Sequence, residues 1–63
     1  MSANPVMAQK FLKGVDYPAS KEDLVRTAQE QGADERIMQT LERLPEQRFE
    51  GPQAVTKAIG EIG

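Results

Sequence analysis

Few side chains of this chain are of the types that perform chemistry. Histidine and cysteine are absent from its 63 residues, so a nucleophile has no imidazole to activate it, and zinc or haem has no thiolate or imidazole to bind it. Of the serines, Ser2 stands near the first residue and Ser20 precedes a helical pattern, where it suits a cap. Paired carboxylates need a desolvated cleft for acid–base catalysis, and so short a chain has little volume for one. We therefore predict that the protein is not an enzyme and has no cofactor, metal or small-molecule substrate.

The balance of charge gives little support to a nucleic-acid binder. Ten acidic and eight basic residues leave a formal charge of -2, whereas a dedicated nucleic-acid-binding domain presents a strongly basic face. The five glycines are isolated, and none forms a glycine-rich phosphate-binding loop. The apolar runs are too short to cross a membrane, and the first residues lack the features of a signal peptide. We expect a cytoplasmic protein that does not bind membranes.

A helix-turn-helix is the alternative that would give the chain a nucleic acid to bind. Ala28 and Gly32 have the spacing at which two helices approach closely before a short turn. The second helix of such a motif would begin at Asp34 and Glu35, whose carboxylates would face phosphates and acceptor-rich base edges. An ordinary helical corner ended by a glycine explains the same residues. In the nucleic-acid interpretation, four side chains face a groove: Arg36, Gln39, Thr40 and Arg43.

Aromatic and basic side chains are the candidates for contact with a protein. Tyr17 and Phe49 are the large residues outside the regular apolar stripes, and aromatic residues are enriched in the energetic centres of interfaces. They also suit the two ends of a core, with the tyrosine hydroxyl reaching water or a backbone group. Three basic residues near the junction of the last two helices form a candidate patch, or are merely solvated charges: Arg43, Arg48 and Lys57.

Start and stop signals predict the first two helices. Asn4 as N-cap, with Pro5 in the first turn, predicts a helix that ends at Gly14. Ser20 and the aspartate three residues later form a close relative of the capping box. This pair predicts a second helix, which ends near Gly32.

Similar signals predict two more helices and almost no strand. Asp34 is the expected N-cap of the third helix, and Pro45 closes it. Gly51 and Pro52 open the fourth, inside which Gly60 costs about 1 kcal/mol relative to alanine. No stretch alternates between apolar and polar residues over four or more positions, so the strand content is expected to be near zero.

Packing must hold these helices, because isolated helices of this length are marginal in water. We predict a single all-α domain over residues 1–63, with four short helices packed as a small orthogonal bundle. The second and third helices are expected to form a helix-turn-helix-like corner, and Tyr17 and Phe49 to lie at the edges of the core. The predicted core comprises Phe11, Leu12, Leu24, Val25, Ala28, Ile37, Met38, Leu41, Leu44, Val55, Ala58 and Ile59.

One combined pattern extends over residues 15–59. It consists of Tyr17-Pro18-Ala19-Ser20-Lys21, Leu24, Ala28, Gly32-Ala33-Asp34, Leu41, Leu44-Pro45, Phe49, Pro52, Val55 and Ala58. The pattern resembles an uncharacterised family of small bacterial domains. The resemblance implies a bacterial origin and an autonomous helical domain, and it implies no activity, because the family has no assigned function or catalytic residues. The first helix lies outside the likeness.

Two functional hypotheses follow from these observations. The leading one is a small non-catalytic module that binds an unidentified protein partner, or forms a homodimer through its first or last helix. Small size, mixed charge and apolar residues near both ends of the sequence favour it. The alternative is a helix-turn-helix-like accessory regulator that binds nucleic acid.

Overall fold

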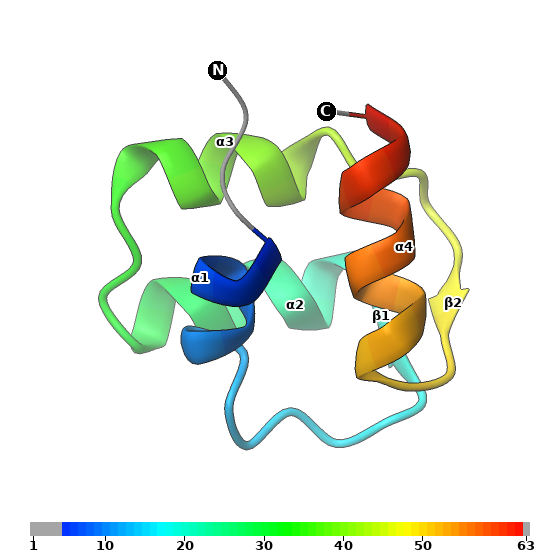
Figure 1. Cartoon of the computed structure of the whole chain (residues 1–63). Coiled ribbons are helices and arrows are strands. Elements are labelled where there is room, and N and C mark those ends of the chain that lie inside the picture. Colours follow the sequence, from blue (N-terminus) through cyan, green and yellow to red (C-terminus); the bar gives the residue numbers. More distant parts are fainter. Residues whose placement is uncertain (1–4, 63) are drawn as a thin grey trace.

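Helices make up most of the chain, and two very short strands accompany them (Figure 1). The computed structural model describes the backbone of residues 5–62 and the side chains of residues 7–62, so the predicted cap at Asn4 lies outside the described residues. The elements are α1 (Pro5–Lys10), β1 (Ala19–Ser20), α2 (Lys21–Glu30), α3 (Glu35–Glu42), β2 (Arg48–Phe49) and α4 (Pro52–Ile62).

The first helix is shorter than predicted. α1 ends at Lys10, and the residues after it form a turn, in which the Phe11 N–H donates to the Ala8 carbonyl at 3.1 Å. Gly14 then has a φ of 93°, in the left-handed region that glycine adopts without a steric cost. Phe11 and Leu12 therefore reach the core from a turn, whereas the sequence placed them inside the helix.

The capping box predicted for the second helix is confirmed. The Asp23 N–H donates to the Ser20 hydroxyl, and the Ser20 N–H donates to the Asp23 carboxylate, each at 3.1 Å. At the other end of α2, Gly32 has a φ of 85°. Its N–H donates to the Gln29 carbonyl and that of Ala33 to the Ala28 carbonyl, the two bonds of a Schellman motif.

The third helix begins as predicted and ends earlier. The Asp34 carboxylate accepts the Ile37 N–H at 2.9 Å, which confirms Asp34 as the N-cap. α3 ends at Glu42 with Arg43 as its C-cap. Leu44 thus lies beyond the helix, although it is buried as predicted.

The expectation of almost no strand misses a small sheet. β1 and β2 pair in antiparallel fashion, with Ala19 opposite Phe49 and Ser20 opposite Arg48. Strands of two residues are too short to show an alternating pattern, and their pairing joins segments that are distant in the sequence. The sheet connects the start of α2 with the chain just before α4.

The helices pack in two pairs. α2 packs on α3, and α1 packs on α4. In Figure 1, α3 lies above α2, and α4 stands beside both of them next to β2. A side-chain link supports the second pair, because the Gln9 amide donates to the Pro52 carbonyl at 2.9 Å and to the Thr56 hydroxyl at 3.0 Å.

The core contains most of the residues predicted for it. Phe11, Val25 and Met38 are only partly buried at its margin. Phe49 corrects the prediction of an edge position, because its exposed fraction is 0% and it is the largest fully buried side chain. Two small residues were missed, Ala8 and Ala19. The buried apolar residues are Ala8, Leu12, Ala19, Leu24, Ala28, Ile37, Leu41, Leu44, Phe49, Val55, Ala58 and Ile59.

Candidate functional site

A groove of about 590 Å³ lies over the outer face of the two-stranded sheet. Residues 18–22 form one wall and residues 46–48 the other. Ala19 and Phe49 are paired across the strands and both are buried, whereas Ser20 and Arg48 are paired, exposed and line the groove. The inner face of the sheet therefore anchors it in the core, and the outer face lines the groove. We call this site the sheet groove.

The sheet groove carries both signs of charge. Lys21 and Glu22 belong to the first turn of α2, and Glu46 and Arg48 belong to the opposite wall. The Arg48 Nε atom lies 2.9 Å from a carboxylate oxygen of Glu50, and both side chains are about seven-tenths exposed. Such an exposed pair contributes at most about 1 kcal/mol to stability, so Arg48 can exchange this partner for another carboxylate at little cost.

The polar groups beside the groove are engaged by the capping box. The Asp23 carboxylate accepts the Ser20 N–H and also lies 2.6 Å from the Arg26 guanidinium. The bond from the Ser20 backbone is the main reason why the pKa of Asp23 lies below its ordinary value. Ser20 serves as the helix cap, which is the structural role expected from the sequence.

Tyr17 is half-buried with an unsatisfied hydroxyl. Its ring packs against the core, and its hydroxyl oxygen is buried without a hydrogen-bond partner among the residues that the structure describes. Burial raises the pKa of the Tyr17 phenol above its ordinary value. The sequence led us to expect that this hydroxyl would reach water or a backbone group, and among residues 5–62 no backbone group bonds to it.

Phe49 is not a surface anchor. Its side chain is completely buried, so a partner cannot touch it while the chain is folded. The interpretation of Phe49 as a partner-binding residue is therefore wrong, and its interpretation as a core residue is right. Its contribution to a site is indirect, because it holds β2 and hence Arg48 in place.

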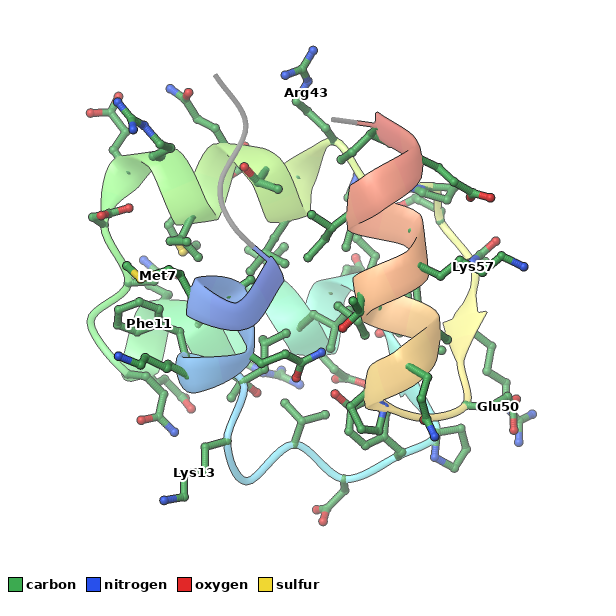
Figure 2. All side chains as sticks on the ribbon, in the orientation of Figure 1. Met7, Phe11, Lys13, Arg43, Glu50 and Lys57 are labelled. Atoms are coloured by element: carbon green, nitrogen blue, oxygen red, sulfur yellow. The ribbon has the colours of Figure 1, made fainter. Side chains whose placement is uncertain are left out.

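Two of the three basic residues predicted to converge, Arg43 and Lys57, point apart. Figure 2 shows Arg43 and Lys57 pointing into solvent in different directions, from the end of α3 and from the side of α4. Arg48 lines the sheet groove. These residues are close to the same helix junction in the sequence. The direction in which each side chain points depends instead on how its own helix or strand is rotated about its axis.

The residues of the nucleic-acid interpretation are divided by the structure. Thr40 is only 6% exposed, and its hydroxyl donates to the Arg36 carbonyl at 2.9 Å, so its placement in a DNA-facing set is wrong. Arg36, Gln39 and Arg43 are exposed. The Gln39 amide donates to the Glu35 carboxylate at 3.3 Å, and this carboxylate remains on the surface that would approach phosphates.

One apolar surface residue was not predicted. Met7 is 44% exposed. Within the described part of the chain, it is the large hydrophobic residue whose side chain is classed as exposed to solvent. Met7 has the helical spacing of a buried stripe, which favours a packing role, although methionine also suits adaptable surfaces. α1 is short and packs mainly on α4, so one of its apolar side chains is left uncovered.

Residues 5–62 contain neither a membrane span nor a metal-binding cluster. No helix in that range is long and apolar enough to cross a membrane. Within the same range, no group of three or more acidic side chains is arranged to hold a metal ion.

Comparison with known families agrees with the pattern found in the sequence. The model of a family described as protein of unknown function, DUF2795, matches residues 3–56, and the chain belongs to this family. The resemblance to an uncharacterised family is thereby confirmed. The match extends over α1, which the sequence pattern of residues 15–59 had left outside. No curated protein and no solved structure matches the chain.

Proposed function

We propose that this DUF2795 domain is a non-catalytic cytoplasmic module that binds a protein partner in the sheet groove. The observation that carries the proposal is the construction of the groove. Its two walls come from segments more than twenty residues apart, and the β1–β2 pairing holds them together. Because Ala19 and Phe49 anchor that pairing in the core, the groove exists before a partner arrives, and binding has little ordering cost to offset.

The charges of the groove indicate what kind of segment would bind. Lys21 and Arg48 would attract carboxylates, and Glu22 and Glu46 would attract basic side chains. A segment of one sign only would meet repulsion from half of these groups, so the fitting partner is an extended protein segment with side chains of both signs. Opposed charges of this kind set orientation and specificity more than affinity.

The exposure of the groove supports binding over catalysis. Apart from Ala19 and the half-buried Lys21, its lining residues are exposed. General acid–base or nucleophilic catalysis depends on desolvated groups within reach of one another. An open surface with mixed charge suits recognition.

Site-specific cross-linking tests the proposal. A photo-reactive amino acid at Gln47, inside the groove, should capture a partner in the native host, and the same amino acid at Gln29, an exposed residue of α2 outside it, should not. The captured protein is then purified, and its binding to the whole domain is measured by calorimetry. Arg48→Glu should weaken binding about tenfold, whereas the matched control Arg36→Glu should not change it. Capture from Gln29 alone, no capture from Gln47, or equal binding of both variants would refute the groove.

The alternative function remains a helix-turn-helix-like nucleic-acid binder. It requires that the four helices form an orthogonal bundle in which α2 and α3 meet in a tight corner at Gly32. The short turn supports this description, and the exposed Arg36 and Arg43 support contact with phosphates. Amide NMR titration with mixed-sequence duplex DNA at low salt tests it, because shifts confined to residues 34–43 that weaken with added salt would favour DNA over the groove. An unchanged spectrum would remove it.

A further inference from the structure

A second surface surrounds α1. Met7 is 44% exposed, and Phe11, four residues later, is half-buried. Figure 2 shows both side chains projecting from the same side of this segment. A single exposed apolar residue is ordinary on a protein surface, so the significance of this pair depends on the residues around it.

Two lysines border the apolar pair. Lys10 follows Met7 by three positions on the helix and precedes Phe11 directly, and Lys13 lies in the turn that follows. Both are exposed, and neither takes part in an ion pair within the described part of the chain. We call Met7, Lys10, Phe11 and Lys13 the α1 surface. Both charged side chains of this surface are basic, whereas the sheet groove carries charges of both signs.

A second copy of the chain does not fit this surface. A stable dimer buries about 800 Å² per partner, close to a fifth of the 4202 Å² of accessible surface of this chain. α1 has six residues, a length of about 9 Å, and offers far less. A two-fold contact centred on α1 would also bring Lys10 near its copy, and like charges repel.

We propose that the α1 surface binds an apolar helical segment of another protein that is flanked by carboxylates. Met7 would enter the apolar face of that segment, because methionine adapts its shape to an irregular partner. Lys10 and Lys13 would meet the flanking carboxylates. Met7 and Phe11 point away from the side on which Figure 1 shows β1 and β2, so this site is separate from the sheet groove and does not rest on the function proposed for it.

Titration with two synthetic peptides tests the proposal. The first is an amphipathic helix of about fifteen residues with leucines on one face and glutamates flanking them, and the second has lysines in place of the glutamates. Amide NMR of the whole labelled chain should show shifts at residues 7–13 with the glutamate peptide only. Lys10→Glu combined with Lys13→Glu should weaken that binding about tenfold, and Met7→Ser should weaken it about threefold. Arg48→Glu, in the sheet groove, should leave it unchanged.

Three results would overturn the proposal. They are the absence of shifts at residues 7–13 up to millimolar peptide, equal shifts with the lysine peptide, and stronger binding to vesicles of anionic lipid than to the glutamate peptide. A dimer in light scattering that Met7→Ser abolishes would assign the surface to a second copy. Circular dichroism of each variant shows whether it remains folded, and the partly exposed Met7 makes loss of folding in Met7→Ser a minor concern.

Discussion

The hydroxyl of Tyr17 is the polar group whose removal should stabilise the protein. The oxygen is buried and has no hydrogen-bond partner within residues 5–62, and a buried hydroxyl without a partner costs about 1–3 kcal/mol. Tyr17→Phe keeps the ring, which packs against the core, and removes only this oxygen. Because the residue is partly exposed, we expect the lower end of that range, an increase of about 1 kcal/mol in the free energy of unfolding. For a domain of this size, that corresponds to a rise in Tm of about 4–8 °C.

Thermal and urea unfolding followed by circular dichroism measure this change. Tyr17→Leu is the matched control, and it should destabilise the protein, because it removes ring contacts together with the hydroxyl. A fall of about 0.5 kcal/mol or more in Tyr17→Phe would refute the reasoning, since it would show that the hydroxyl has a stabilising partner in solution.

The same residue gives a pH test with a definite sign. Burial raises the pKa of Tyr17 in the folded chain above its ordinary value of 10.0, so the unfolded chain releases this proton first as the pH rises. Ionisation of Tyr17 does not affect stability below about pH 10, and stability falls as the pH rises from there toward the folded pKa, because the folded chain disfavours the phenolate that the unfolded chain forms. Wild-type protein should lose stability above about pH 10, and Tyr17→Phe should lack that part of the alkaline decline. Equal declines in both proteins would contradict the burial of the phenol.

Four further predictions concern local features. Gly60→Ala should stabilise α4 by about 0.5–1 kcal/mol, since an added Cβ would meet nothing within 4 Å. Gly32→Ala should destabilise the protein by about 1–2 kcal/mol, because its φ is 85°. In urea unfolding, a loss of stability in Gly60→Ala would refute the first prediction, and a gain in Gly32→Ala would refute the second. Asp23→Asn should reduce the loss of stability at acid pH. The pKa of Asp23 in the folded chain lies below its ordinary value of 3.8. The ionised carboxylate therefore stabilises the fold above that ordinary value, and this stabilisation disappears as the pH falls through the folded pKa. Urea unfolding between about pH 5 and 2 measures this change, and an equal fall in the free energy of unfolding with pH in both proteins would contradict it. Gln9→Ala should cost about 1 kcal/mol and speed amide exchange in α1, because it removes the bonds from the Gln9 amide to α4; unchanged exchange would show that those bonds do not hold α1.

The local features of this chain follow from its sequence alone. The capping box at Ser20, the N-cap at Asp34 and the end of the second helix near Gly32 were all predicted, and the structure confirms each of them. These features depend on groups three to five residues apart, and side-chain type alone decides whether such groups can bond. The absence of histidine and cysteine also excludes every site that needs an imidazole or a thiolate, whatever fold the chain adopts.

The candidate sites depend on contacts that no local pattern contains. Phe49 was expected at an edge and is completely buried, because β2 pairs with β1 across a long stretch of chain. The same pairing brings Arg48 to the wall opposite Lys21. Helical spacing shows which face of a segment is apolar, but it does not show which neighbour covers that face. Met7 has the helical spacing of a buried residue and is nevertheless exposed. α4 packs on only part of helix α1, and only the tertiary structure determines which part.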